Sequence, residues 1–179
     1  DTELGLKLFE RGWRAVYLPE SLGRGVMPDT YAAYKDQRYR WVYGGMQILK
    51  RHARQLFGRK GGLSAGQRYH FVAGWLPWFA DALGLVFGLL GLLWSALVMW
   101  DPRQFDVPLS AFSLVVITLF SVKTAKTVVL HRYRVKARKR DVGGAAVAGL
   151  SLAFVVGKAV LFGLCTRGLP FVRTPKCEA

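Results

Sequence analysis

One uncharged run of 19 residues, from Ala82 to Trp100, constrains the fold of this chain more than any other feature. An α-helix rises about 1.5 Å per residue, so about 20 apolar residues cross a bilayer core of roughly 30 Å. Apolar residues extend the run back to Phe71, and a helix that is apolar all round for this length is unusual in a soluble protein. We therefore predict a transmembrane helix, with Pro77 at a kink or in its first turn.

A second transmembrane helix is predicted from Val107 to about Val122, and it extends to Leu130 if its lysine side chains reach back to the membrane surface. The loop between the two spans carries a single positive charge, Arg103. The positive-inside rule therefore places this loop outside and both flanks in the cytoplasm. The positive charges that follow the second span are Lys123, Lys126, Arg132, Arg134, Lys136, Arg138, Lys139 and Arg140.

A third apolar run, from Gly143 to Cys165, is predicted to be an interface helix rather than a third span. It contains Lys158, and a lysine at the bilayer centre costs about 2.5–3.5 kcal/mol on insertion scales. A third crossing would also carry the basic residues that follow it, Arg167 and Arg173 among them, to the outside. A plain third transmembrane helix is the alternative.

Composition supports a membrane protein with its charges on one side. Hydrophobic residues make up 52% of the chain, yet the formal net charge is +15. A nucleic-acid-binding protein also has a high pI, but long uncharged runs are out of place in one, so we expect no nucleic-acid partner. Cys165 and Cys177 form no C-x-x-C pair and the three histidines are scattered, which indicates neither a disulfide framework nor a metal site.

The first 27 residues are predicted to form a helix from 2 to 11, a strand from Trp13 to Leu18 and a loop from 21 to 27. Glu3 and Glu10 are interpreted as solvated charges on the helix. This unit is too small to fold alone. We expect it to be the last piece of a larger α/β domain, and the chain to be a fragment of a longer protein.

A long helix is predicted from Pro28 to about Phe57, with Pro28 in its first turn. Gln37, Arg40 and Trp41 fall at i, i+3 and i+4, which puts an amide, a guanidinium and an indole on one face. These groups orient a hydroxyl, grip a phosphate and stack on a sugar ring, respectively. The alternative is an amphipathic helix with a basic solvated face and one aromatic anchor.

Three motifs of this chain resemble those of processive family 2 glycosyltransferases, the cellulose synthase-like enzymes, and they follow one another along the sequence in the same order as in that family. Gln37-Arg38-Tyr39-Arg40-Trp41 is similar to the Q-x-x-R-W motif. Asp1 is placed like the Asp that ends the T-E-D motif, and residues 171–176, F-V-R-T-P-K, resemble the F-x-V-T-x-K gating loop. Arg173 stands where that loop has Val, and Cys177 where Gly usually follows.

The resemblance implies a fold and a division of the chain. We expect an α-rich membrane protein fragment with the tail end of an α/β, GT-A-like glycosyltransferase domain, amphipathic interface helices and two transmembrane helices. The expected parts are a piece of the glycosyltransferase domain (1–27), an interface helix with its linker (28–66), two transmembrane helices (71–130), a basic cytoplasmic segment with an interface or third membrane helix (131–169), and a gating-loop-like segment (170–179).

The resemblance also implies roles for individual residues. Asp1 would be the catalytic base, although a lone Asp at a helix N-terminus otherwise reads as a cap. Substrate would be bound by Gln37, Arg38, Arg40 and Trp41, with Arg38 alternatively an interfacial arginine. The gating loop would bring Phe171, Arg173, Thr174 and Lys176 to the nucleotide, the alternative being a basic juxtamembrane turn. Trp75, Trp78 and Asp81 would line the entrance of a channel, the alternative being ordinary aromatic anchors and an interfacial Asp.

The implied activity is transfer of glucose from UDP-glucose to a growing β-glucan by an inverting enzyme. The enzyme would be a multi-pass protein of the inner (plasma) membrane with its catalytic side in the cytoplasm. The family uses Mg²⁺ or Mn²⁺ held by a D-x-D motif, which is absent here, so the metal ligands are expected outside this sequence and the fragment alone is expected to be inactive. The alternatives are a single-transfer enzyme acting on a lipid carrier and a non-catalytic membrane adaptor.

Overall fold

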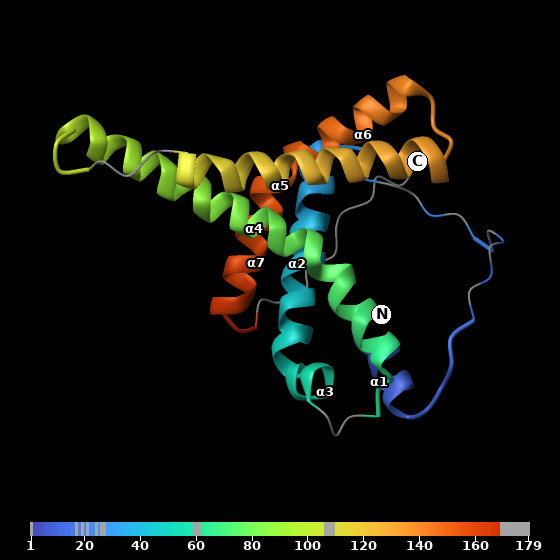
Figure 1. Ribbon diagram of the computed structural model, residues 1–179. Coiled ribbons are helices and arrows are strands. Elements are labelled where there is room, and N and C mark those ends of the chain that lie inside the picture. The colour runs from blue at the N-terminus through green and yellow to red at the C-terminus, as the bar shows by residue number, and fades with distance from the viewer. Residues whose placement is uncertain are drawn as a thin grey trace. The chain divides into compact units, whose positions relative to one another are not determined.

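The computed structural model describes residues 2–16, 18, 20, 22–23, 25, 28–58, 62–105 and 110–168, and every regular element in these residues is helical (Figure 1). They divide into two compact units, one comprising residues 1–76 and 159–179 and the other residues 77–158. The elements are α1 Thr2–Glu10, α2 Tyr31–Arg51, α3 Ala53–Phe57, α4 Ala65–Trp100, α5 Ser110–Val129, the π-helical turn η1 Leu130–Arg134, α6 Lys139–Ser151 and α7 Ala153–Cys165.

Helix α1 confirms the predicted N-terminal helix. It ends before Gly12, whose φ of +83° lies in the left-handed region that favours glycine. The strand predicted from Trp13 to Leu18 is wrong over residues 13–16 and 18, which have no regular structure. A strand needs a hydrogen-bonded neighbour, and the described part of the chain contains no second strand to pair with it.

The long interface helix also differs from the prediction at both ends. Thr30, not Pro28, begins α2, because its hydroxyl accepts a hydrogen bond from the backbone N–H of Ala33 at 3.2 Å. Pro28 precedes this cap and lies outside the first turn. Near the other end, His52 adopts non-helical angles (φ −107°, ψ 18°) and separates α2 from α3.

The first unit is built around α2. Its core consists of apolar side chains from α1, α2, α3, the start of α4 and the end of α7. Phe9 of α1 meets Phe71 of α4 edge to face, with ring centroids 6.2 Å apart. The buried hydrophobic residues of this unit are Leu6, Val42, Tyr43, Met46, Leu56, Leu63, Trp75, Ala159 and Val160.

In the second unit, α4 beyond Pro77 and α5 form an antiparallel hairpin (Figure 1). Near the loop, the Trp94 ring contacts the rings of Phe105 and Phe112 at 5.5 and 5.8 Å between centroids. A Cβ on Gly91 would lie 3.4 Å from the Cβ of Phe112, which is an ordinary van der Waals distance, so α4 and α5 are in contact here.

An ion pair joins the two arms of the hairpin at its other end. The Lys123 ammonium of α5 donates to Oδ1 of Asp81 on α4 at 2.6 Å, and these side chains are 24% and 10% exposed. Both line a largely apolar cavity of about 250 Å³, together with Leu85, Val116 and Phe154. The pair therefore neutralises two charges that would otherwise stand alone among apolar side chains.

Three segments are long and apolar enough to cross a membrane: Ala65–Trp100, Ser110–Arg134 and Lys139–Cys165. The first two contain the predicted spans, although residues 107–109, where the second was expected to begin, lie outside the described residues. By length and composition the third segment also qualifies. Its assignment to the membrane interface therefore stays a prediction.

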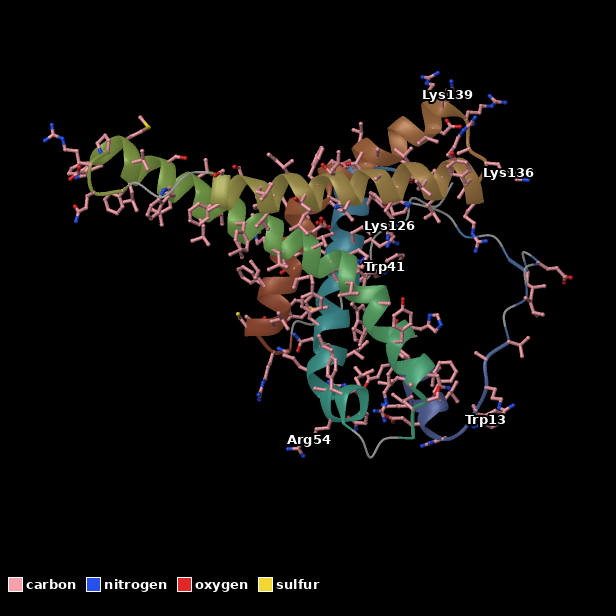
Figure 2. All side chains as sticks on the ribbon, viewed as in Figure 1. Trp13, Trp41, Arg54, Lys126, Lys136 and Lys139 are labelled. Carbon is pink, nitrogen blue, oxygen red and sulfur yellow. The ribbon has the colours of Figure 1, made fainter. Side chains whose placement is uncertain are left out.

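The turn between the second and third segments is strongly basic. η1 closes with an N–H···O bond from Val135 to Leu130 at 3.2 Å, and Lys136 follows with a φ of +55°. Lys136 and Lys139 mark this turn in Figure 2. The turn gathers cations at one end of two apolar helices, and its location on the cytoplasmic side stays a prediction of the positive-inside rule.

Replacing one partner of the Asp81–Lys123 pair is expected to destabilise the membrane helices. In the full-length protein in detergent or nanodiscs, Asp81→Leu should cost about 2–3 kcal/mol, because it leaves a lysine unpaired in an apolar setting. The double variant Asp81→Leu/Lys123→Leu should recover more than half of that loss. Thermal unfolding measures both. Equal losses in the single and double variants would contradict the coupling.

Candidate functional site

The candidate site is the face of α2 that carries Gln37, Arg40 and Trp41. The structure confirms an unbroken helix through these residues, so their spacing places them on one side. Gln37 and Arg40 are half-buried, whereas Trp41, labelled in Figure 2, is 52% exposed. An indole with this exposure offers apolar surface to a ligand.

The guanidinium of Arg38 packs against that indole. Its guanidinium carbon lies 4.8 Å from the centre of the Trp41 ring and 5.0 Å from that of Tyr34. A guanidinium held over aromatic faces restricts the orientation of both rings. The Nε of Arg38 is buried and has no hydrogen-bond partner among the described residues, so this arginine keeps one unused donor beside the exposed indole.

The opposite side of α2 holds the end of α7. At about 100° per residue, Tyr43, Met46 and Lys50 lie roughly 140–180° around the helix from Trp41. Lys50 Nζ donates to the carbonyls of Leu164 and Thr166 at 3.1 and 2.5 Å. Packing on this side leaves the side that carries Trp41 clear of α7.

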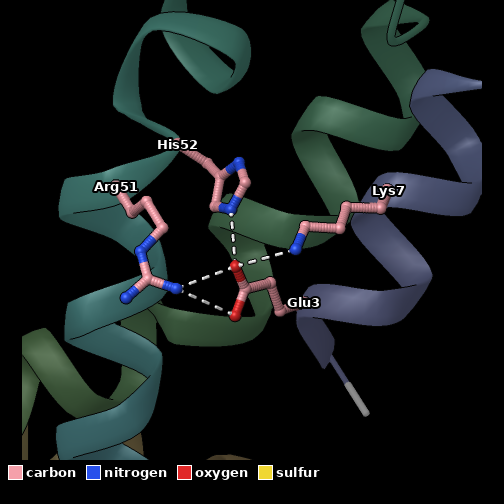
Figure 3. Close-up of polar contacts among 4 residues, drawn as sticks. All are labelled: Glu3, Lys7, Arg51 and His52. Atoms are coloured by element: carbon pink, nitrogen blue, oxygen red, sulfur yellow. Dashed lines mark hydrogen bonds and ion pairs between the residues drawn. The ribbon is translucent and has the colours of Figure 1, made fainter.

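The last residues of α2 hold α1 through Glu3 (Figure 3). Arg51 Nη1 lies 3.0 Å from Glu3 Oε1, His52 Nε2 lies 3.1 Å from the same oxygen, and Lys7 Nζ lies 3.4 Å from it. Because a carboxylate only accepts, the Nε2 of His52 is the donor. The ring of His52 is buried, and its Nδ1 has no partner in the described part of the chain.

This cluster lowers the pKa of Glu3. The hydrogen bond from His52 contributes most, that from Arg51 next, and burial opposes them, which together bring the pKa from 4.5 to about 2. The interpretation of Glu3 as a solvated charge is therefore wrong, because its carboxylate is paired with Arg51 and His52. The contact ties the helix that follows Asp1 to the helix that carries Trp41.

Several predicted site residues lie outside the described residues or away from this face. Asp1 and the loop residues Phe171, Arg173, Thr174 and Lys176 are outside the described residues. Trp75 is 5% exposed and packs on Phe71 at 6.1 Å between centroids, so stacking on a sugar would require its ring to leave this packing. Trp78 and Asp81 belong to the second unit, where Asp81 bonds to Lys123.

No metal site forms in the described residues. Among them no three His, Cys, Asp or Glu side chains come together in a way that holds a metal ion. These residues therefore do not provide a site for the divalent cation expected from the resemblance.

The sequence interpretation missed the residues that position α2. Glu3 is separated from Arg51 by 48 residues, and Lys50 from Leu164 by 114, so no local spacing links them. The sequence contains one weak signal of this contact. Tyr43, Gln47 and Lys50 lie at i, i+4 and i+7, and each side chain ends in a polar group, which is a pattern typical of side chains that face a neighbouring helix.

Comparison with known proteins gives a family match. Residues 1–135 match the model of glycosyl transferase family group 2. Among curated proteins of Oryza sativa subsp. japonica, probable glucomannan 4-beta-mannosyltransferases 4 and 2 are each 25% identical over 72 residues, which is 40% of this chain. Those alignments cover only 13% and 12% of the two relatives, and no solved structure matches.

Removing the charge of Glu3 is expected to destabilise the first unit in a pH-dependent way. At pH 7, Glu3→Gln should cost about 1 kcal/mol, allowing for the partial exposure of the carboxylate. Because the pKa of Glu3 is lower in the folded state, the stability that its carboxylate contributes is fully present above pH 4.5 and is lost as the pH falls toward 2.

Thermal unfolding of full-length wild type and variant between pH 3 and 7 checks this prediction. Their midpoints should converge as the pH falls. Glu20→Gln, which alters an exposed glutamate, should follow wild type throughout. A difference between wild type and Glu3→Gln that stays constant with pH would contradict the prediction.

Proposed function

Because the chain belongs to glycosyl transferase family group 2, we propose that it is part of a membrane-embedded processive enzyme that extends a β-linked polysaccharide from a nucleotide sugar. The observation that carries this proposal is the two-sidedness of α2. Its packed side faces α7, and its other side presents the exposed indole of Trp41, with Gln37 about 40° and Arg40 about 100° from that indole around the helix. The guanidinium of Arg38 over the Trp41 ring supports this proposal, because it gives the exposed indole a defined orientation.

The chemistry divides among these residues. Asp1 takes the proton of the acceptor hydroxyl, whose oxygen attacks the anomeric carbon of the donor sugar. The bond between that carbon and the diphosphate oxygen breaks, so the nucleoside diphosphate leaves and the anomeric configuration inverts. Arg40 holds the departing diphosphate with charge-assisted hydrogen bonds. Gln37 and Trp41 hold the terminal sugar of the acceptor, Trp41 by stacking.

Arg38 has a supporting role in this proposal. By covering one part of the indole it fixes the ring plane against which a sugar stacks. Its unused Nε is within the same group of side chains and supplies positive potential near the diphosphate. Residues 171–176 would close over the donor, with Thr174 on the nucleotide and Arg173 and Lys176 attracting its phosphates.

For the donor we propose UDP-glucose, and for the product a β-glucan. A mannosyl donor is the second candidate, because the relatives named above are probable mannosyltransferases. The polymer would leave through the membrane helices, with the basic turn after α5 and the site of transfer both in the cytoplasm. The apolar helices Ala65–Trp100 and Ser110–Arg134 support a membrane location for this reaction.

Transfer assays on the full-length protein in membrane vesicles test this function. Vesicles receive radiolabelled UDP-glucose or a mannose nucleotide, with Mg²⁺ or Mn²⁺. We expect label in long polymer that a β-glucanase digests. Asp1→Asn should abolish incorporation, and Arg40→Ala should lower kcat/KM about 100-fold, equivalent to about 2.7 kcal/mol of lost transition-state stabilisation.

Arg54→Ala is the matched control, since Arg54 is an exposed arginine on α3 (Figure 2), and it should retain wild-type turnover. If label entered polymer only from the mannose nucleotide, the donor would be a mannosyl donor instead of UDP-glucose, and the proposed roles of the residues would stand. Label in a lipid extract would favour a single-transfer enzyme. If well-folded protein turned over none of these donors, or if Arg40→Ala behaved like wild type, the proposal would be wrong.

A further inference from the structure

We propose that the basic turn between α5 and α6, residues 130–140, binds the phosphate groups of anionic membrane lipids. This is a binding activity separate from the proposed glycosyl transfer and does not depend on it. It requires only that the two helices that the turn joins lie in a membrane or at its surface, and both are long and apolar enough to cross one. Lys136 and Lys139 show the position of the turn in Figure 2.

The turn carries an excess of positive charge that the described part of the chain does not neutralise. The sequence has no acidic residue between Asp106 and Asp141. All the Lys and Arg side chains of the turn are exposed, and none of them forms an ion pair with an acidic side chain among the described residues. They are Arg132, Arg134, Lys136, Arg138, Lys139 and Arg140. Such a surface attracts anions from outside the chain.

The backbone holds these cations together in a tight turn. The N–H of Val135 donates to the carbonyl of Leu130 at 3.2 Å, and the N–H of Ala137 donates to the carbonyl of His131 at 2.9 Å. Lys136, between these two donors, has a φ of +55° and ends the helical path. The chain therefore reverses within a few residues, and the cations at the end of η1 lie near those at the start of α6.

The cations at the start of α6 do not serve the stability of that helix. Arg138 is the N-cap, its side chain makes no capping hydrogen bond, and Lys139 and Arg140 follow in the first turn. The N-terminus of a helix is the positive end of its dipole, so cations there are unfavourable. Asp141 supplies one negative charge in the same turn. A bound anion would relieve the repulsion that remains.

Apolar side chains among the cations favour a lipid as the source of this anion. Tyr133 and Val135 alternate with cations along the chain and are 73% and 61% exposed. Tyrosine is enriched where a membrane meets water, and both side chains bury apolar area by contact with acyl chains. A lipid phosphate comes with such chains, whereas a soluble phosphate or a nucleic acid does not cover these apolar groups.

Fluorescence quenching in the full-length protein tests the proposal. A fluorophore is attached through Val135→Cys, in a background without other cysteines, and the protein is placed in phosphatidylcholine nanodiscs. A small share of the lipid carries a nitroxide near the top of one acyl chain, on either phosphatidylglycerol or phosphatidylcholine. Labelled phosphatidylglycerol should quench about 3-fold more strongly than labelled phosphatidylcholine, because the cations concentrate the anionic lipid around the turn.

The loop at the other end of α5 provides a matched site. Gln104 is exposed, and Arg103 is the one Lys or Arg in residues 101–106. A fluorophore attached through Gln104→Cys should be quenched equally by the two labelled lipids. An equal preference for the anionic lipid at both sites would overturn the proposal, as would equal quenching by the two lipids at residue 135.

Neutralising the cations should remove the preference. In Arg138→Gln/Lys139→Gln/Arg140→Gln, the quenching ratio at residue 135 should fall below about 1.5, and salt at about 0.5 M should lower the ratio in wild type. In phosphatidylcholine alone, this variant should unfold at no lower temperature than wild type, because its cations do not stabilise α6. A clearly lower midpoint would show a structural role and contradict the proposal.

A variant with the same loss of charge in the first unit is the control. Arg11→Gln/Arg14→Gln/Arg54→Gln changes exposed side chains and should keep the wild-type ratio at residue 135. If this variant lost the preference equally, net charge rather than the basic turn would attract the lipid, and the proposal would be wrong. It would also be wrong if the two lipids quenched equally while a labelled oligonucleotide bound wild type but not the variant of the turn. The transfer assay above reports the proposed function separately, since quenching requires no turnover.

Discussion

The close approach of α7 to α2 at Gly163 is the contact on which the arrangement of the first unit depends. It requires the absence of a side chain at that position and brings the unsatisfied carbonyls of α7 within reach of Lys50 and Gln47. The contact also decides which side of α2 stays clear of α7. Trp41 lies on the side of α2 that α7 does not cover, and its indole is therefore exposed.

The same helix gathers the segments that the sequence keeps apart. Glu3 bonds to Arg51 and His52 at its end, which ties down the helix that follows Asp1. In the second unit, the Asp81–Lys123 pair performs a comparable task between two apolar helices. Charged contacts thus fix register in both units, whereas the apolar surfaces supply most of the burial but little directional information.

The sequence predicted the apolar helices and the motif helix well, because both depend on local periodicity. It failed where distant partners decide the outcome. The strand expected at Trp13–Leu18 has no neighbour among the described residues, and Thr30 rather than Pro28 caps α2 because a hydroxyl, not a ring, satisfies a free N–H. Glu3, Lys50 and Gln47 looked like ordinary charged or polar helix residues, since their partners lie 48 to 119 residues away.

Thermal unfolding of Gly163→Ala tests the central claim most directly. In the full-length protein, a Cβ at residue 163 would lie 2.7 Å from the Cβ of Met46, so Gly163→Ala should push α7 away from α2 and lower the stability by about 1–3 kcal/mol. Gly44→Ala, which lies in the same unit but has nothing within 4 Å of the added Cβ, should be at least as stable as wild type. A lower thermal midpoint in Gly163→Ala alone is the predicted result, and equal midpoints in the two variants would contradict the account.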